Sequence, residues 1–310
     1  MRTSYFNIPS PQGYIWCAYD QAEDRSQEAP LVIIAPGYEK TSRNNIALAL
    51  YLVLNGFNVL RFDASNCTGL SSGDIENFTL SSFTQDIETV IDYASDYLAG
   101  SHLISVISLS LSSRCLVKYL AGNPGAHNKI LAFLSIVGVC DVEYTASQIL
   151  GANHYPETFA GRRFGVRKFM TYDVNWDNFF LDAKDFGYLS FDTAIADAQK
   201  VNIPYFISIM TDHDEWNLAW QQKVFFIHLQ CAHKEQTVIE GASHQIWKNP
   251  RSAEIALQYC VKYLKNLYPH PSLEIIRPDM TDIIEINRRE RRVIMESTLT
   301  KSHKSLEVTA

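Results

Sequence analysis

The sequence predicts a protein of the α/β class, with a mostly parallel sheet that helices flank and one segment inserted over it. Short, continuous apolar runs recur along the chain, as expected for strands that are covered on both faces. Segments with helical spacing separate these runs, and this alternation is typical of a parallel sheet. The alternation stops between residues 141 and 200 and resumes at residue 203, which indicates the insertion.

The first part of the chain contains the most regular stretch of this pattern. In order, the residues predict a hairpin at 5–8 and 14–19, a strand at 31–35, a helix at 45–55, a strand at 57–62, a helix from about 82, a strand and a helix within 103–120, and a strand at 131–137. A proline- and glycine-containing turn at residues 9–13 joins the hairpin, and Gly56 ends the first helix. Ser82 and Gln85 have the capping-box spacing, which predicts a helix N-terminus at Ser82.

Residues 141–200 interrupt the pattern, because they are rich in aromatic, aspartate and glycine residues and contain no clear strand. We predict a cap over the carboxyl edge of the sheet, since open α/β sheets bind ligands at that edge. A poorly patterned helical excursion is the alternative. Beyond this segment the residues predict a strand at 203–210, a helix near 220–231, a strand at 236–239 and a helix at 252–267.

The C-terminal segment has a different, charge-rich character. Ile283, Ile286 and Val293 have roughly helical spacing beside the run Arg288-Arg-Glu-Arg-Arg292, which favours a solvated surface helix. An interaction arm is the alternative. The expected organisation is a core of residues 1–140 and 201–276, a cap of residues 141–200, and a charged helix or tail of residues 277–310.

Composition excludes several classes of protein. The chain has 310 residues, of which 46% are hydrophobic and 20% charged, and this suits a globular protein with a sizeable core. The formal net charge of −7 argues against a nucleic-acid partner. No apolar run approaches the ~20 residues of a membrane span, and the N-terminus lacks the apolar region of a signal peptide. Six scattered cysteines without a C-x-x-C pair favour buried, reduced thiols and a cytoplasmic location.

Ser110 is the candidate nucleophile, because it follows an apolar strand and directly precedes a helical segment. A serine at such a turn presents its hydroxyl above the sheet, beside the N–H groups of a helix N-terminus. The usual signature has glycine two residues before and after the nucleophile, whereas this chain has Ser108 and Ser112. Among the neighbouring serines only Ser110 has small residues at both positions. A capped helix without chemistry is the alternative.

Two further candidate groups follow strands later in the chain. The loop after strand 203–210 contains three acids, Asp212, Asp214 and Glu215, and the residues alone leave the choice among them open. His244 comes just beyond the strand at 236–239, a context that the other histidines lack. The order serine, acid, histidine, each after a strand, is that of the α/β-hydrolase fold, in which the three groups carry out acyl transfer.

Two other features of a site can be judged from these loops. His213 stands among acids, but three adjacent residues do not easily converge on one ion, so we expect no metal and no cofactor. An oxyanion hole needs two backbone donors. The N–H of Leu111, directly after the nucleophile, is one candidate; the N–H of Tyr38, which Gly37 allows to approach closely, is the other.

The chain resembles the acyltransferase family of bacterial bioluminescence, whose members release a fatty acid from acyl-carrier protein for a fatty-acid reductase complex. The resemblance spans nearly the whole chain. It is carried by Ala35-Pro-Gly-Tyr38, Asn55-Gly-Phe-Asn-Val-Leu-Arg-Phe-Asp63, Gly69-Leu-Ser-Ser-Gly73, Ser110-Leu-Ser-Ser-Arg114, Asp214-Glu-Trp216, Gly241-Ala-Ser-His244 and Ser272-Leu-Glu274.

The resemblance implies an α/β-hydrolase that cleaves medium-to-long fatty acyl thioesters of acyl-carrier protein or coenzyme A. By matching position, Ser110 is the nucleophile, Asp214 the acid and His244 the base. A serine two residues after the nucleophile belongs to the family pattern, whereas Ser108 replaces an alanine. The loop at 211–214 is one residue longer than in the family.

Several aspects of function remain alternatives at this stage. The partners implied are the acyl thioester substrate and a fatty-acid reductase-like complex. The segment 151–180 has no close match in the family, and its basic residues Arg162, Arg163, Arg167 and Lys168 could dock an acidic carrier protein. A hydrolase of small esters or of a C–C bond on the same three residues is a second possibility. A hydrolase-fold scaffold without catalysis is a third.

Overall fold

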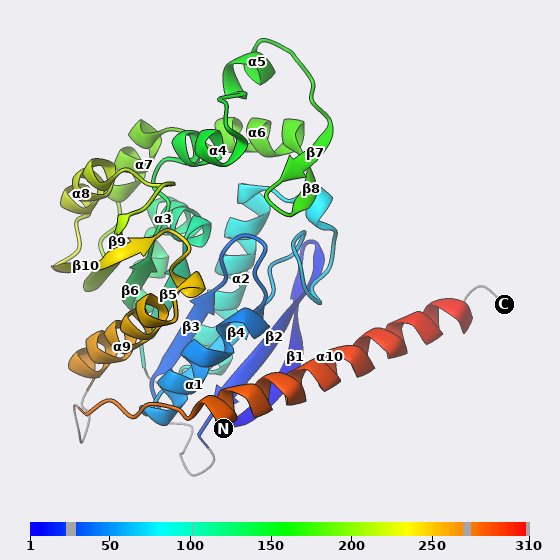
Figure 1. Ribbon diagram of the computed structural model, residues 1–310, viewed down its shortest axis with the longest axis vertical. Coiled ribbons are helices and arrows are strands. Elements are labelled where there is room, and N and C mark those ends of the chain that lie inside the picture. Colours follow the sequence, from blue (N-terminus) through cyan, green and yellow to red (C-terminus); the bar gives the residue numbers. More distant parts are fainter. Residues whose placement is uncertain (23–28, 101, 269–273, 308–310) are drawn as a thin grey trace.

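One eight-stranded sheet organises the chain (Figure 1). The computed structural model describes the backbone of residues 1–22, 29–100, 102–268 and 274–307, and side chains as far as residue 296. The strands of the sheet are β1 (Arg2–Ser10), β2 (Gly13–Gln21), β3 (Leu31–Ala35), β4 (Asn58–Phe62), β5 (Ile104–Leu109), β6 (Ile130–Ile136), β9 (Tyr205–His213) and β10 (His233–Ser243). Their order is β1-β2-β4-β3-β5-β6-β9-β10. Only β1–β2 and β2–β4 pair antiparallel in this sheet, so the predicted mostly parallel sheet is confirmed.

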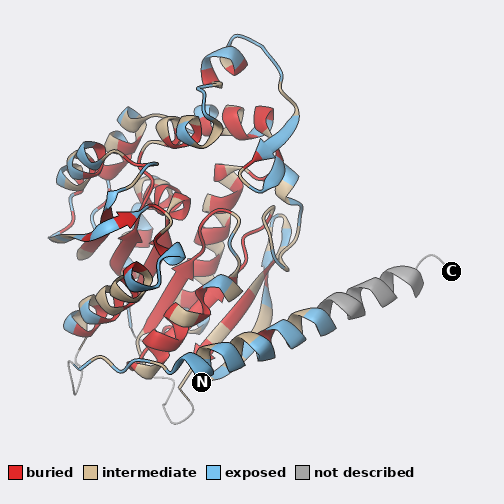
Figure 2. Cartoon of the chain, in the orientation of Figure 1, coloured by how far each residue is buried: buried red, intermediate tan, exposed pale blue. Residues whose placement is uncertain are grey.

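Helices cover both faces of this sheet. Those outside residues 141–200 are η1 (Ser42–Asn45), α1 (Ile46–Leu54), η2 (Ile75–Asn77), α2 (Leu80–Tyr97), α3 (Leu111–Gly122), η3 (Pro124–Asn128), α8 (Ala219–His228), η4 (Ile246–Lys248), α9 (Pro250–Leu267) and α10 (Met280–Glu307). One apolar cluster joins α1 and α9 to the sheet, and a second joins α2 and α3 to it. The central strands are therefore buried on both sides, as Figure 2 shows.

Residues 141–200, called the inserted segment below, lie between β6 and β9. They form α4 (Val142–Leu150), α5 (Tyr155–Phe159), β7 (Val166–Phe169), β8 (Tyr172–Asn175), α6 (Trp176–Asp185) and α7 (Phe191–Ala198). The prediction of no strand here is wrong, because β7 and β8 pair as an antiparallel hairpin. These strands are short and mostly exposed, so they lack the apolar alternation that identifies a strand in sequence.

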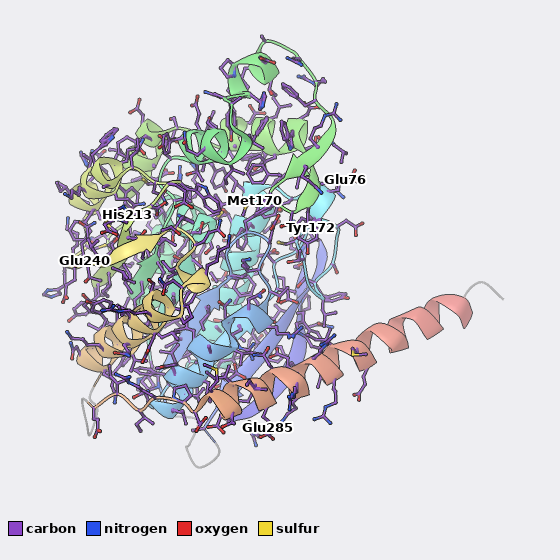
Figure 3. All side chains as sticks on the ribbon, viewed as in Figure 1. Glu76, Met170, Tyr172, His213, Glu240 and Glu285 are labelled. Atoms are coloured by element: carbon purple, nitrogen blue, oxygen red, sulfur yellow. The ribbon has the colours of Figure 1, made fainter. Side chains whose placement is uncertain are left out.

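The inserted segment lies against the core at two places near its hairpin. Figure 3 shows Met170 and Tyr172 in the hairpin close to Glu76, and β8 contacts η2 there. The Thr171 N–H also donates a hydrogen bond of 2.7 Å to the Glu39 side chain. In Figure 1 the segment lies over the end of the sheet at which the parallel strands terminate.

Helix α2 begins earlier than predicted. Thr79, not Ser82, is its N-cap: the Thr79 hydroxyl accepts a hydrogen bond of 3.2 Å from the Ser82 N–H. Ser82 instead occupies the third helical position and its hydroxyl donates back to the Thr79 carbonyl. Thr79, three residues upstream, therefore provides the capping hydroxyl that was predicted at Ser82.

The two C-terminal strands extend past their predicted ends. β9 includes Asp212 and His213, which were predicted to lie in a loop, and β10 includes Gly241 to Ser243. The pairing of these strands is irregular between Ile239 and Ser243. There the Asp212 carboxylate accepts hydrogen bonds of 3.0 and 3.2 Å from the Gly241 and Ala242 N–H groups, so a side chain replaces the regular ladder.

Helix α10 is not simply a solvated surface helix. Its Glu290 is buried and lies 3.2 Å from the Arg61 guanidinium, which also contacts Asp20 at 2.6 Å. Asn287 accepts a further hydrogen bond of 3.4 Å from Arg43. A charge on an apparently solvated helix thus pairs with a buried arginine on β4, a contact that helical spacing does not reveal.

Several smaller observations complete the fold. Each of the six cysteines is a free thiol, and all except the partly buried Cys67 are buried. Among the helices that the structure describes, none is long and apolar enough to cross a membrane. Of the motif at 272–274, only Glu274 lies within the described residues.

Candidate active site

Ser110 occupies a strained turn between β5 and α3. Its φ of 55° and ψ of −116° are unusual for a residue with a side chain. Both of its backbone groups are held: the N–H donates to the Ile136 carbonyl at 3.0 Å, and the carbonyl accepts from the Val139 N–H at 3.1 Å. The strain is thus maintained by neighbouring backbone, and the serine hydroxyl faces the cavity described below.

The serines that replace the usual glycines are buried and hydrogen-bonded. The hydroxyls of Ser108 and Ser113 lie 2.7 Å apart, and the Ser135 hydroxyl donates to Ser113 at 3.0 Å. The Ser112 hydroxyl accepts a hydrogen bond of 2.8 Å from the Leu109 N–H. The Ser108 hydroxyl is thus paired with another serine and the Ser112 hydroxyl with backbone groups, which explains how serine is accommodated where glycine is usual.

His244 bridges the candidate nucleophile Ser110 and an acid. Its Nε2 lies 2.7 Å from the Ser110 Oγ, and its Nδ1 lies 2.9 and 3.0 Å from the two carboxylate oxygens of Asp214. A carboxylate only accepts hydrogen bonds, so Nδ1 must be the donor and carry the hydrogen. Nε2 is then unprotonated and accepts a hydrogen bond from the Ser110 hydroxyl. The His244 side chain is 3% exposed and that of Asp214 8%, so solvent hardly enters this chain of contacts.

The three acids that the sequence could not separate have different partners. Asp214 faces the His244 imidazole. Asp212 is bonded to the backbone of β10, as described above, and Glu215 accepts the His244 backbone N–H at 3.1 Å. All three carboxylates thus help to arrange this end of the sheet, but only Asp214 reaches the ring.

Asn217 is a site residue that sequence reasoning missed. It is buried, and its side-chain Nδ2 lies 3.1 Å from the second Asp214 oxygen, Oδ2. The backbone N–H groups of Trp216 and Asn217 both donate to the first oxygen, Oδ1, at 2.9 Å. An asparagine three residues after an acid is a weak signal, but this spacing permits such side-chain-to-backbone bonds.

The two expected oxyanion donors flank the same space. Neither the Tyr38 nor the Leu111 backbone N–H makes a hydrogen bond to a described residue. At Gly37 a β-carbon would lie 3.4 Å from the Leu109 carbonyl oxygen, which is ordinary van der Waals contact, so the approach of this loop to the turn does not depend on glycine. The Tyr38 ring packs edge-on against Phe78 and Phe169, which holds this loop in place.

A cavity of about 290 Å³ opens over Ser110 and His244. The inserted segment lines one apolar side of it, with Val142, Ala146, Ile149, Phe169 and Phe179, and the core contributes further apolar residues, among them Leu109, Val137, Val139 and Trp216. Its polar side comes from the core loops, with Lys40, Asn44, Asn45, Gln245 and Lys248. An apolar hollow beside a polar rim suits a ligand with an acyl chain and a polar remainder.

The predicted basic residues of the inserted segment do not line this cavity. Arg162 pairs with Glu157 and lies over the Phe164 ring, 4.7 Å from its centre. Arg163, Arg167 and Lys168 are exposed.

The acidic run around His213 forms no ion-binding group. The His213 side chain is 73% exposed and points to the surface beside β9 (Figure 3). Within the described residues, no three histidine, cysteine or acidic side chains converge as a metal site would require.

Solved structures resemble this fold throughout. Est1E from Butyrivibrio proteoclasticus with bound ferulic acid has a TM-score of 0.70 at 17% identity, covering 84% of this chain and 98% of its own. The α/β hydrolase GrgF from Penicillium sp. has a TM-score of 0.59 at 15% identity, with coverages of 84% and 98%. The chain therefore has the α/β-hydrolase fold.

Sequence relatives define the family within that fold. A family model described as acyl transferase matches residues 13–297, and the chain belongs to this family. The acyl transferase of Photobacterium leiognathi is 28% identical over 276 residues, which are 84% of this chain and 81% of that protein. The acyl transferase of Aliivibrio fischeri is 27% identical over 278 residues, with coverages of 84% and 83%. The resemblance seen in the sequence is confirmed, and the protein is an enzyme that acts on acyl groups.

Proposed function

We propose that the protein is a serine acyl thioesterase or acyltransferase, which takes medium-to-long fatty acyl groups from acyl-carrier protein or coenzyme A. The observation that carries this proposal is the continuous contact from Ser110 Oγ through the His244 ring to Asp214, at 2.7 and 2.9 Å. Such a chain activates a serine hydroxyl, which is a weak nucleophile by itself.

In the first half-reaction Ser110 Oγ attacks the thioester carbonyl carbon while His244 Nε2 takes the hydroxyl proton. Asp214 holds the ring and stabilises the imidazolium that forms. The tetrahedral intermediate then collapses: the carbon–sulfur bond breaks, the carrier thiol leaves with the proton from His244, and the acyl group remains on Ser110.

The negative oxygen of the intermediate needs donors that are already in place. The free N–H groups of Tyr38 and Leu111 would supply them, one from the loop after β3 and one from the N-terminus of α3. Since neither N–H is engaged elsewhere, no hydrogen bond among the described residues must break before the oxyanion forms.

In the second half-reaction His244 removes a proton from the acceptor, which attacks the acyl carbon and releases Ser110 with its proton restored. If the acceptor is water, a free fatty acid leaves; if it is a partner's nucleophile, the acyl group is transferred. Thioesterase and acyltransferase are therefore one mechanism with two acceptors, and a fatty-acid reductase-like complex is the partner we propose. A cytoplasmic location belongs to the same proposal.

The apolar side of the cavity supports a fatty acyl substrate over a small ester. Val142, Ala146 and Ile149 recur at helical spacing on α4, so one face of this helix lines the hollow. A short ester would leave this face uncovered and gain no binding from it.

The test replaces the nucleophile and measures both turnover and labelling. Ser110→Ala should lower kcat for a myristoyl thioester by about 10⁶-fold, as removal of a triad serine does. It should also abolish labelling by a fluorophosphonate probe, whereas Ser243→Ala, at an exposed serine of the same sheet edge, should keep both. Unchanged turnover in Ser110→Ala would refute the mechanism.

Two outcomes with the unmodified protein would favour the alternatives. Preference for short esters over long acyl-carrier protein would indicate a small-ester hydrolase on the same residues. Failure of the probe to label the protein at all would indicate a hydrolase-fold scaffold. Mass measurement of the acyl group trapped from mixed acyl thioesters identifies the chain length.

A further inference from the structure

Segment 136–139, which begins at the last residue of β6, touches both halves of the candidate site. On one side, Ile136 and Val139 hold the backbone N–H and carbonyl of Ser110, at 3.0 and 3.1 Å. On the other side, the Val137 carbonyl lies 3.4 Å from the Asn217 Nδ2, which also contacts Asp214. One short stretch of backbone thus links the nucleophile to the residue that holds the acid.

This segment is strained and tightly packed. Val137 has a φ of 44°, which is a genuine outlier for a β-branched residue, and its N–H donates to the Ile209 carbonyl at 2.9 Å. A β-carbon on Gly138 would lie 2.0 Å from the Ser135 Oγ and 2.7 Å from the Ser113 Oγ, so no larger residue fits. Strain of this kind persists only where its surroundings over-determine it, and it clusters at functional sites.

The orientation of the Asn217 amide follows from its neighbours. Two acceptors, Asp214 Oδ2 and the Val137 carbonyl, face Nδ2, so turning the amide would place Oδ1 against two oxygens. In this orientation the buried Oδ1 has no hydrogen-bond partner among the described residues. The side chain thus leaves an acceptor unsatisfied while it donates to the acid, which is typical of a group retained for its position.

The imidazole adds a second constraint. Asn217 Nδ2 lies 3.2 Å from His244 Nδ1, but both atoms are donors when Nδ1 carries the proton that Asp214 accepts. The amide is therefore compatible with the Nδ1–H form only while the Asp214 carboxylate accepts from both donors in its observed place. If the carboxylate were displaced, Nδ1–H would lose its acceptor and the tautomer would no longer be fixed.

We propose that Asn217 is a positioning residue: its amide fixes Asp214 to the strained segment 136–139 and so keeps the acid–imidazole pair in register with Ser110. The inference rests on the proposed serine mechanism. It concerns alignment rather than substrate binding, because Asn217 does not line the cavity. A misplacement of the order of 1 Å in such an arrangement can cost about 10²-fold in rate.

The test compares two replacements with a matched control. Asn217→Asp keeps the shape but removes both donors, and Asn217→Ala removes shape and donors. Asn58→Ala is the control, since Asn58 is also buried and its Nδ2 donates to a carbonyl, but it lies at the opposite end of the parallel strands. We expect kcat to fall about 10–100-fold in both Asn217 variants, with KM within about twofold. Asn58→Ala should keep kcat.

A spectroscopic readout separates positioning from general destabilisation. Nitrogen-15 NMR of the imidazole should show the Nδ1–H tautomer in the wild-type protein and in Asn58→Ala, and loss of that tautomer in folded Asn217→Ala. Wild-type kcat together with an unchanged tautomer in Asn217→Ala would overturn the proposal. Ser110→Ala, measured in parallel, tells this apart from failure of the serine mechanism: if it remains active the mechanism is wrong, whatever the tautomer shows.

Discussion

The two sides of the cavity are built in different ways. On the sheet edge, Ser110, Asp214 and His244 are held by hydrogen bonds from neighbouring backbone or side chains and are largely removed from solvent. On the inserted segment, the β7–β8 hairpin is mostly exposed, as the pale blue colour in Figure 2 shows. Aromatic contacts hold that side, for example between Phe169 and Phe179, whose ring centres are 5.3 Å apart.

This difference corresponds to two separate requirements, one of the acyl-transfer reaction and one of the choice of substrate. Acyl transfer requires donors and acceptors at fixed distances, and directional hydrogen bonds in a buried place provide them. Holding an acyl chain requires only a hollow of suitable size, which non-directional packing provides. Changes on the sheet edge should therefore alter rate, and changes on the inserted segment should alter substrate preference.

After the loss of the Ser110 hydroxyl, the largest effect is expected from Asp214→Asn. The amide no longer holds the Nδ1–H tautomer, so kcat should fall about 10⁴-fold, as it does when the acid of a serine triad is replaced in this way. The preference among acyl chain lengths should stay the same, because the hollow is untouched. Steady-state kinetics across a series of acyl thioesters measure both quantities. A loss below tenfold would mean that Asp214 does not orient the histidine.

Asp86→Asn should raise the free energy of unfolding at pH 8. Asp86 is buried on α2, accepts the Ser65 N–H at 2.6 Å, and has a pKa that burial raises from 3.8 to about 7. The folded state therefore binds the proton more tightly than the unfolded chain. Between pH 3.8 and about pH 7 the free energy of unfolding therefore falls as the pH rises.

The variant removes this loss of stability. At pH 8 Asp86→Asn should be more stable than wild type by up to roughly 4 kcal/mol, and at pH 3 the two should be similar. Urea unfolding at the two pH values measures the difference. An equal difference at both values would show that Asp86 does not titrate as burial implies.

Ala146→Phe should change the preferred acyl chain length without abolishing acyl transfer. Ala146 lies on α4 and lines the apolar hollow, so a larger ring shortens the available space. Long chains should lose about 10–200-fold in kcat/KM relative to short ones, the range that small steric differences in apolar pockets produce. Ala146→Leu serves as the intermediate step, and the fluorophosphonate labelling rate should remain near wild type. An unshifted chain-length profile would place the acyl chain elsewhere.

The smallest effect is expected from reversing charge on the inserted segment. If Arg163 and Arg167 attract an acidic carrier protein, their double replacement by glutamate should lower kcat/KM for acyl-carrier protein up to about tenfold at low salt. Added salt should reduce this effect, and a neutral acyl-pantetheine should be unaffected. Lys262→Glu, at an exposed residue of α9 outside the inserted segment, is the control for a charge reversal elsewhere. Equal losses with both substrates would contradict a docking role.

The sequence was most informative where local pattern decides structure. The strands β3 to β6 are buried on both faces, and their continuous apolar runs, separated by segments with helical spacing, identified them in the sequence. The hairpin of the inserted segment escaped detection, because exposed strands four residues long carry no apolar pattern. The end of β9 was misplaced for a related reason: Asp212 and His213 are polar, yet pairing with β10 keeps them extended.

By itself the sequence indicated the class of fold, Ser110 as the candidate nucleophile, and the order of the candidate groups, because these depend on neighbours along the chain. The residues alone left three acids open and the family resemblance pointed to Asp214, whereas only the tertiary structure showed how Asp212, Asp214 and Glu215 differ in their partners and that Asn217 contacts Asp214. It also brought Glu290 to Arg61 across 229 positions. The physical reason is that Asp214 and Glu215 follow the end of β9, where strand periodicity no longer fixes the direction of a side chain, and that the irregular pairing of β9 and β10 turns Asp212 to the backbone of β10.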